Sequence, residues 1–256
     1  MAMHVVPGTL STDGEDVYAD AGHVSATHDQ TSQGGQDGLQ GQGREEAVSG
    51  LAAAWGSRGQ NDECVRVWMQ TIRTHPLSWP PGARLLEIGC QDADWLTYAA
   101  QADPSIVVTG LDWRGSRKGP GTRLKGDVLV QDFAPGSFEA IAMISTLEHI
   151  GLGHYSHDPI AEDGDIETLK RCAEWLVPGG WVYADVPYAA AYSVFKTKCR
   201  IYDQQAVLTR LAVPGLRLEY QGWTKKTGEA ITQDEAAVPA GFAYTALVWR
   251  KVADGV

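Results

Sequence analysis

ARLLEIGCQDADW, residues Ala83–Trp95, is the stretch that decides the fold. Its largely apolar run Leu85–Ile88 predicts a buried strand, and Gly89 predicts a sharp turn directly after it. Asp92 is of a residue type that caps helices, and apolar side chains follow it at helical spacing. A strand, a tight turn and a helix in this order are typical of a doubly wound α/β sheet that binds a nucleotide-like cofactor.

The chemistry of this turn narrows the choice of cofactor. A second predicted strand, Ser105–Trp113, contains Asp112 near its end, where a carboxylate can accept hydrogen bonds from two ribose hydroxyls. A loop that binds pyrophosphate reads GxGxxG, whereas here Gly89 stands alone, which disfavours a nicotinamide oxidoreductase. The acid Glu87 beside the turn favours a cofactor with cationic groups. A turn that binds no ligand is the alternative.

Composition excludes several classes of protein. The 256 residues suit one α/β domain, and the net charge of −11 does not indicate a nucleic-acid surface. The four cysteines lack CxxC spacing, which argues against both zinc and a disulfide framework. There is no apolar run of membrane-spanning length and no signal-peptide pattern, so we expect a cytoplasmic protein.

The chain divides by composition into a tail and a folded domain. Residues 1–43 are rich in Gly, Gln, Ser, Thr and Asp and predict a flexible, acidic, low-complexity tail. A docking arm that becomes ordered on a protein partner is the alternative. We expect residues 44–256 to form one domain, with N-terminal helices over 44–82 and the sheet core over 83–256. The two helices are expected over Arg44–Trp55 and from about Asn61.

Helices and strands alternate in the rest of the chain. In order, we predict a strand at Ala140–Ser145, a helix from Asp163 or Asp165 that Pro178-Gly179-Gly180 stops, a strand at Trp181–Pro187, a helix from about Asp203, and closing strands at Leu216–Trp223 and Phe242–Val252. This order predicts a Rossmann-like α/β fold. Its sheet is expected to be seven-stranded and mostly parallel, with a C-terminal antiparallel hairpin and helices on both faces.

A local excess of positive charge follows the second strand. The basic residues are Arg114, Arg117, Lys118, Arg123 and Lys125. A solvated loop explains them most simply, and contact with an anionic substrate is the alternative.

Five segments, spread over about Ala83–Val252, resemble the motifs of the class I S-adenosylmethionine-dependent methyltransferases. LLEIGC resembles the first motif and VVTGLDW the second. Gly126-Asp127, with Phe138 eleven residues later, resembles the third. STLEHIG resembles the segment that leaves strand four, and LVPGGWVYADVP the end of a helix followed by strand five. The segment EHIGLGHYSHDPIAEDGD is similar to a poorly characterised branch suspected of acting on glycans or other small molecules.

The resemblance implies S-adenosylmethionine as the cofactor. It places Asp112 on the ribose, Trp113 beside the adenine and Asp127 at the adenine amino group. The full implied cofactor site is Glu87, Gly89, Cys90, Asp112, Trp113 and Asp127. The implied function is methyl transfer to a small molecule or glycan, at oxygen. Since the first motif has Gln91 and Ala93 where the family usually has glycines, a non-catalytic binding or structural module on the same fold is the alternative.

Transfer to a hydroxyl needs a group that removes its proton, and a histidine does this near neutral pH. His149, just after the strand predicted at Ala140–Ser145, is our first choice as the base; the alternative is that it only fixes the loop. Glu148 is the second choice, or a carboxylate that orients the substrate. The acceptor pocket is expected to include His154, Tyr155, Tyr188 and Tyr192, although the last two can equally be core residues.

Three further groups of residues allow other interpretations. Glu148, His154, His157 and Asp158 have the residue types of metal ligands, but they match no template on one irregular loop, and we expect no metal. The acids Glu162, Asp163 and Asp165 are more simply helix caps and partners of the helix dipole. Pro187-Tyr188 is similar to a motif of enzymes that methylate adenine in DNA, but that motif leaves strand four, so nucleic acid is not expected as a partner.

Overall fold

The computed structural model describes residues 67, 71, 79–90, 100, 104–115, 119–155, 159–225, 227–237 and 243–253. All of them lie in the second of the two units into which the chain divides, Gln40–Val256. The expected tail over 1–43 and the expected helix Arg44–Trp55 lie outside the described residues. Val67 and Thr71 are helical, in agreement with the helix expected from about Asn61.

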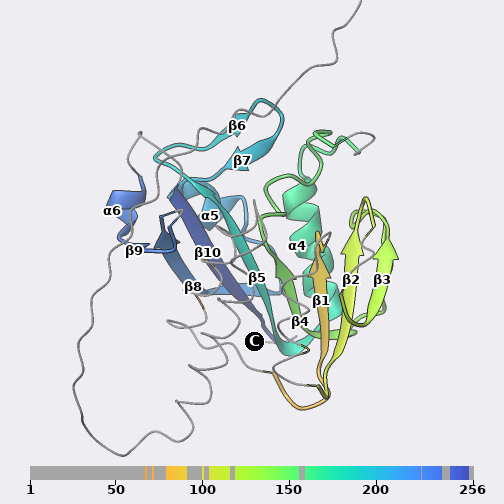
Figure 1. Ribbon diagram of the computed structural model, residues 1–256. Helices are drawn as coiled ribbons and strands as arrows, with labels where there is room; N and C mark the ends of the chain where they lie inside the picture. The colour runs from red at the N-terminus through yellow and green to blue at the C-terminus, as the bar shows by residue number, and fades with distance from the viewer. Residues whose placement is uncertain are drawn as a thin grey trace, which may run out of the picture. The chain divides into compact units, whose positions relative to one another are not determined.

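The main sheet has eight strands among the described residues, in the order β3-β2-β1-β4-β5-β10-β8-β9 (Figure 1). The strands are β1 Arg84–Ile88, β2 Val107–Asp112, β3 Thr122–Lys125, β4 Phe138–Met143, β5 Leu176–Tyr188, β8 Leu216–Thr224, β9 Ala230–Ile231 and β10 Ala243–Lys251. Strands β1 to β5 pair in parallel, and β10 lies antiparallel between β5 and β8. The predicted Rossmann-like sheet with its reversed strand is therefore confirmed. The predicted count of seven was one too low, because the two-residue strand β9 extends the edge.

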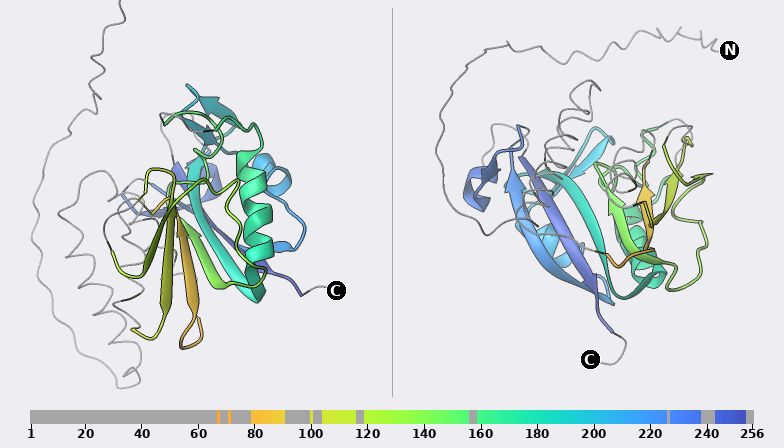
Figure 2. Two further views of the ribbon diagram at one scale, coloured as in Figure 1. Left: turned by 90° about the vertical axis from the view of Figure 1, so that its right-hand side faces the viewer. Right: turned by 60° about the horizontal axis from the view of Figure 1, so that its bottom comes forward.

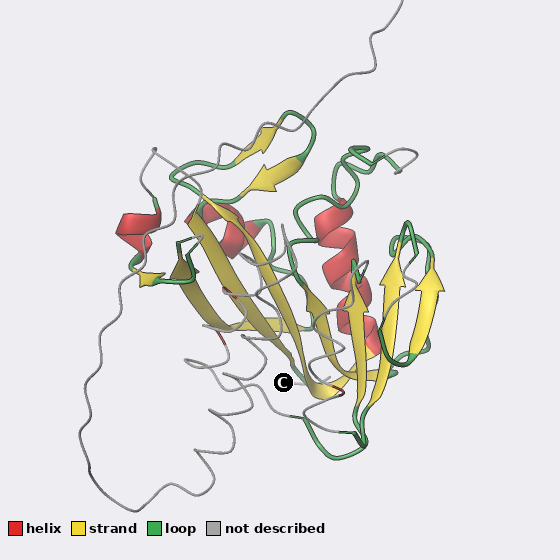
Figure 3. Ribbon diagram, in the orientation of Figure 1, coloured by secondary structure: helices red, strands yellow, loops and turns green. Residues whose placement is uncertain are grey.

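The other described elements lie around this sheet (Figure 3). They are helix α4 Gly164–Trp175, helix α5 Gln204–Thr209, helix α6 Gln233–Ala236 and a small hairpin of β6 Ser193–Phe195 and β7 Cys199–Ile201. Helix α5 begins where the sequence predicts a helix, and Asp203 caps it by accepting a hydrogen bond from the backbone N–H of Ala206. Within the described part of the chain, no helix is long and apolar enough to span a membrane.

The strands carry apolar side chains on both faces, as a sheet with helices on both sides requires. On one face, Leu86 and Ile88 of β1 belong to the core cluster that includes residues of α4 and α5. On the other face, Leu85 belongs to a second cluster with the helical residue Val67, and the helical residue Ala100 packs against it. Helices on both faces are thus confirmed.

The junction between α4 and β5 differs from the prediction. Helix α4 ends at Trp175, before the Pro178-Gly179-Gly180 segment that was expected to stop it. Leu176, which the predicted helix would have included, instead begins β5 and pairs with Phe138 of β4. The long strand β5 therefore contains the glycines, and the pairing shifts register next to Phe138.

The basic segment after β2 also contains a strand that the sequence pattern did not predict. Thr122–Lys125 forms β3, which pairs with Thr109–Asp112 of β2 at the edge of the sheet. Its short length and lack of apolar residues other than Leu124 explain why periodicity did not identify it.

Candidate functional site

The carboxyl ends of β1 and β4 mark the point where the strand order reverses, since β1 pairs with β2 on one side and β4 on the other. Open α/β sheets bind ligands at such a point. Gly89 makes the turn there with a φ of +80°, and its backbone N–H donates to the Leu111 carbonyl at 2.8 Å. A side chain at Gly89 would clash with Thr146, so only glycine lets the loops after β1 and β4 meet this closely.

Two buried carboxylates lie at this edge. Glu87 belongs to the end of β1 and Asp112 to the end of β2. The Asp112 Oδ1 atom accepts a hydrogen bond from the backbone N–H of Arg114 at 2.7 Å, and the Arg114 Nε atom lies 3.6 Å away. Asp127 follows β3, and its Oδ1 atom accepts from the backbone N–H of Leu129 at 2.9 Å. The predicted acids thus lie at or just after the carboxyl ends of three neighbouring strands.

The other two predicted cofactor residues differ in their surroundings. Cys90 is fully buried against Gly110, where a side chain would clash with its sulfur. Burial, followed by the charge of Glu87, raises the pKa of the Cys90 thiol to about 12. The thiol is therefore neutral and part of the core, which leaves the backbone of Cys90 for any cofactor contact. Trp113 is half-buried directly after β2.

Each ring nitrogen of His149 has one neighbouring oxygen atom. Its Nδ1 atom lies 2.5 Å from the carbonyl oxygen of Lys198, and its Nε2 atom lies 3.4 Å from Glu148 Oε1. A carbonyl can only accept, so Nδ1 carries the hydrogen and Nε2 is the basic nitrogen of the neutral ring. This geometry suits a general base acting through Nε2, and the same contact with Lys198 also fixes the loop, so both alternatives for His149 stay predictions.

Rings from the predicted acceptor pocket gather around His149. His154 stacks at 6.4 Å between ring centroids, and Tyr155 packs edge-on at 5.8 Å. The guanidinium of Arg114 lies 4.7 Å above the Tyr155 ring. The loop after β2, which contains Arg114, therefore contacts the loop after β4, so that the expected ribose acid Asp112 and the expected base belong to one connected region.

The two predicted tyrosines do not join this cluster. Tyr188 is 1% exposed and packs edge-on against Trp223 in a small core cluster with Ala236. Its packing is that of a core residue, which was the alternative interpretation. Tyr192 lies directly before β6, is 37% exposed, and packs edge-on against Tyr202. Substrate contact by either tyrosine stays a prediction.

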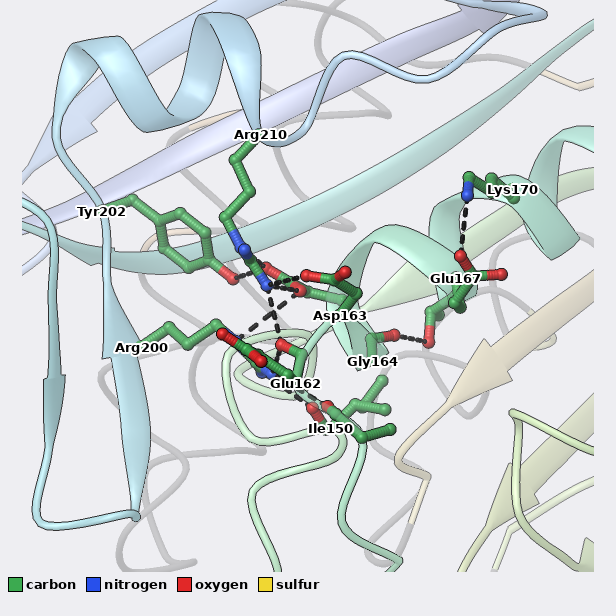
Figure 4. Close-up of polar contacts among 12 residues, drawn as sticks. Ile150, Glu162, Asp163, Gly164, Glu167, Lys170, Arg200, Tyr202 and Arg210 are labelled. Atoms are coloured by element: carbon green, nitrogen blue, oxygen red, sulfur yellow. Dashed lines mark hydrogen bonds and ion pairs between the residues drawn. The ribbon is translucent and has the colours of Figure 1, made fainter.

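A buried charge network anchors the loop that carries His149 (Figure 4). Arg200 of β7 is 1% exposed and donates to the carbonyls of Ile150 and Glu162. The carboxylate of Asp165 accepts from Arg210 at 2.7 and 2.8 Å and from the Tyr202 hydroxyl at 2.8 Å, and Arg200 Nε lies 3.6 Å from it. The network ties the loop to the start of α4, to β7 and to α5.

This network corrects one prediction about the acids at the start of α4. Asp163 occupies the N-cap position, but its side chain makes no capping hydrogen bond to the described start of the helix, and Asp165 is wholly buried. Asp165 is therefore the centre of an ion-pair network rather than a helix cap. Its position was indicated by helical spacing, because Asp165, Leu169 and Cys172 lie on one face of α4 and all three are buried.

Known proteins match both part of the sequence and the fold. A family model described as "Caenorhabditis protein of unknown function, DUF268" matches residues 129–220, a range that includes α4, β5 and the β6–β7 hairpin. No curated protein is significantly similar in sequence.

Solved structures match over most of the chain. The complex of the Haloferax volcanii Trm112 methyltransferase activator with a putative methyltransferase matches with a TM-score of 0.56 and 15% identity, over 80% of this chain and 98% of that one. The 1,6-didemethyltoxoflavin-N1-methyltransferase of Burkholderia thailandensis, with bound S-adenosylhomocysteine, gives 0.53 and 14%, over 82% and 87%. The [4+2]-cyclase SpnF gives 0.54 and 16%, over 82% and 94%.

The chain has the fold of the S-adenosylmethionine-dependent methyltransferases. The expected fold is thereby confirmed. Identities of 16% or less establish the fold alone, so the roles of individual residues rest on the geometry of this chain.

Within this methyltransferase fold, a buried acid that the sequence analysis did not identify is linked to Glu148 through Ser145. Asp185 of β5 is wholly buried, and its Oδ1 atom accepts from the backbone N–H of Ser145 at 2.9 Å. The Ser145 hydroxyl donates to Glu148 Oε1 at 3.0 Å, and Ser145 has a φ of +45°, which is unusual for a residue other than glycine. Among the described residues, the second oxygens of Asp185 and Glu148 have no hydrogen-bond partner. The sequence did contain a signal for this buried acid, because Asp185 stands within the otherwise apolar segment WVYADVP.

Burial shifts both carboxyl groups toward their neutral forms. Desolvation raises the pKa of Glu148, against the opposing effects of His149 and Arg200. Desolvation and then the nearby charge of Glu148 raise the pKa of Asp185 well above its ordinary value. Ionising the pair in the folded protein is therefore unfavourable, and the folded state binds more protons than the unfolded state as the pH rises above the ordinary carboxyl pKa.

Asp185→Asn is expected to stabilise the protein at pH 8. The contribution of Asp185 is fully present below its unfolded pKa of about 4 and is lost as the pH rises through the higher folded value. The amide keeps the acceptor for Ser145 and removes the ionisation. The Tm of the variant should therefore exceed that of the parent at pH 8 and differ little from it at pH 4. The exposed control Asp132→Asn should have a Tm close to that of the parent at both pH values. A Tm of Asp185→Asn below that of the parent at pH 8 would contradict this account.

The described residues hold no group of three or more potential metal ligands. His157 and Asp158, two of the four residues considered for a metal, lie outside the described residues.

Proposed function

We propose that this protein is an S-adenosylmethionine-dependent methyltransferase that acts on a small molecule or glycan, at oxygen. One observation carries the proposal: two buried carboxylates, Glu87 and Asp112, lie at the ends of β1 and β2, beside the reversal of strand order in a methyltransferase fold. Two carboxylates at such an edge are complementary to a cofactor that carries both hydroxyls and cationic groups.

The side chains at this edge fit such a cofactor. Asp112 would accept from the two ribose hydroxyls, and Glu87 would face the cationic methionine part. Trp113 and Asp127 would lie at the adenine, with Gly89 and the backbone of Cys90 in the turn between these groups. The single glycine of the turn suits a cofactor without phosphate. When bound, S-adenosylmethionine supplies a methyl group that is already activated for transfer.

The protein's own contribution is alignment and removal of a proton. Alignment of an acceptor with an activated group is worth about 7–11 kcal/mol of the barrier. In the proposed reaction, His149 takes the acceptor's hydroxyl proton on Nε2, while the Lys198 carbonyl holds Nδ1–H and so fixes the tautomer. The Glu148 Oε1 atom lies 3.4 Å from Nε2, so it would accept a hydrogen bond from the protonated ring.

The alternative is a protein of this fold that binds a ligand or partner without transferring a methyl group. One observation favours keeping it: a similar solved structure is described as a [4+2]-cyclase, so the fold does not by itself determine the reaction.

The assay that separates these proposals uses S-adenosylmethionine with a labelled methyl group. The full chain is incubated with sugars, nucleotide sugars and small phosphorylated alcohols, and S-adenosylhomocysteine and labelled acceptor are measured together. A methyltransferase should produce both in equal amounts, and only when an acceptor is present. Tight binding of S-adenosylhomocysteine without turnover of any acceptor would favour the non-catalytic alternative.

A further inference from the structure

The β6–β7 hairpin is placed beside the proposed catalytic loop. It is inserted between β5 and α5 and lies beyond the carboxyl end of β5 in both Figure 1 and the left view of Figure 2. The backbone N–H of Arg200 donates to the Glu148 carbonyl at 2.9 Å, and the Lys198 carbonyl contacts His149. One strand of the hairpin is therefore joined to the residues proposed to remove the acceptor proton.

The other strand of the hairpin exposes apolar side chains. All three residues of β6 are exposed, and the ring of Phe195 and the side chain of Val194 are 41% and 45% accessible. With Tyr192, three of the seven large exposed hydrophobic residues among those described lie within four consecutive positions. Contiguous exposed apolar groups of this kind mark binding surfaces more often than isolated ones do.

The tip of the hairpin is strained. Lys196 and Thr197 have φ values of +47° and +55°, and the Lys198 N–H donates to the Phe195 carbonyl at 2.7 Å across a two-residue turn. This kind of turn favours Asn-Gly, and a β-branched residue such as threonine adopts a positive φ only at a cost. Strained positions persist mainly where they serve function. Here the turn holds the Lys196 ammonium 5.3 Å above the Phe195 ring.

The local charge is opposite to that of the whole chain. The protein has a net charge of −11, yet residues 189–200 contain Lys196, Lys198 and Arg200 and no acid. Arg200 is buried in the ion-pair network, whereas both lysines are exposed. An apolar strand followed by two exposed ammonium groups is complementary to a ligand with an apolar body and a negative group.

We propose that the β6–β7 hairpin binds the methyl acceptor, and that this acceptor has an apolar or aromatic body and an anionic group, either phosphate or carboxylate. The inference rests on the proposed function, because it takes the loop of Glu148 and His149 as the place of methyl transfer. The apolar side chains of β6 contact the body, and the ammonium groups of Lys196 and Lys198 contact the anion.

The test uses phenyl phosphate as the probe, titrated into the full chain with and without S-adenosylhomocysteine. The double variant Lys196→Glu/Lys198→Glu keeps the Lys198 carbonyl and should weaken probe binding more than tenfold, with unchanged affinity for S-adenosylhomocysteine. Phe195→Ala should weaken phenyl phosphate but not inorganic phosphate. Benzoate, titrated in parallel, distinguishes a carboxylate from a phosphate acceptor. Lys170→Glu/Lys225→Glu is the matched control, since both lysines are exposed and lie outside the hairpin.

Equal binding of phenyl phosphate to the hairpin variant and to the matched control would overturn the proposal. So would loss of binding to phosphatidylglycerol vesicles in the hairpin variant with unchanged phenyl phosphate affinity, because the hairpin would then be a membrane contact. Absence of S-adenosylhomocysteine binding would instead overturn the proposed function. The titration of phenyl phosphate in the absence of S-adenosylhomocysteine tests the hairpin separately.

Discussion

Replacing Asp165 by alanine is expected to lower the free energy of unfolding by about 3–5 kcal/mol, the range for breaking a buried ion pair by removing one partner. Asp165 is wholly buried and accepts three hydrogen bonds, two from Arg210 and one from the Tyr202 hydroxyl. The hydrogen bonding between Asp165 and Arg210 is the largest cause of the raised pKa of the Arg210 guanidinium. Without the carboxylate, the buried guanidinium of Arg200 keeps its carbonyl partners but loses its counter-charge.

Urea unfolding with a matched control measures this effect. Glu167 lies on the same helix and forms an exposed ion pair with Lys170, so Glu167→Ala should cost less than about 1 kcal/mol. If Asp165→Ala does not fold, Asp165→Asn keeps some of the hydrogen bonds and should still cost more than the control. A loss for both Asp165 variants no larger than that of Glu167→Ala would show that the network does not stabilise the fold.

His149→Ala is expected to reduce turnover by about 10²–10⁴-fold with an acceptor identified by the labelled-methyl assay, the usual effect of losing a general base. The affinity for S-adenosylhomocysteine should stay near that of the parent, because His149 is not among the proposed cofactor residues. Steady-state kinetics and calorimetry measure the two quantities. If the variant turns over at the parental rate, the base lies elsewhere, and Glu148 and His154 become the next candidates.

A second variant separates the base from a residue that only fixes the loop. His149→Asn keeps a side-chain donor near the position of Nδ1, so it can still bond to the Lys198 carbonyl, but it has no counterpart of the basic Nε2 atom. A general base predicts that His149→Asn is as inactive as His149→Ala. Recovery of activity in His149→Asn would support the loop-fixing alternative.

The parts of the fold that periodicity specifies were predictable from sequence. The apolar runs of β1, β4 and β5, together with Gly89 and Asp112 at the strand ends, indicate where the cofactor edge lies, because the carboxyl ends of parallel strands share one edge. The β6–β7 hairpin was not predicted, since its strands are three residues each and its turn lacks the usual Asn-Gly.

The buried charges could be predicted only in part. Asp165 and Asp185 stand at positions where the spacing of a helix or strand turns them inward, which is a detectable signal. Their partners come from distant segments: Arg200 and Arg210 follow Asp165 by 35 and 45 residues, and Ser145 precedes Asp185 by 40. One sequence does not say which distant groups meet, so the ion-pair network and the pair of buried acids needed the structure.

The affinity of S-adenosylhomocysteine for the full chain and for Asp112→Ala tests the central claim most directly. Calorimetry should give one site per chain, weakened more than tenfold in the variant, because hydrogen bonds to a charged group are worth about 1.5–3 kcal/mol each and about 1.4 kcal/mol is a factor of ten. The exposed control Asp132→Ala should bind like the parent. No binding to the parent, or equal binding to the parent and to a folded Asp112→Ala, would contradict a cofactor site at the carboxyl ends of β1 and β2.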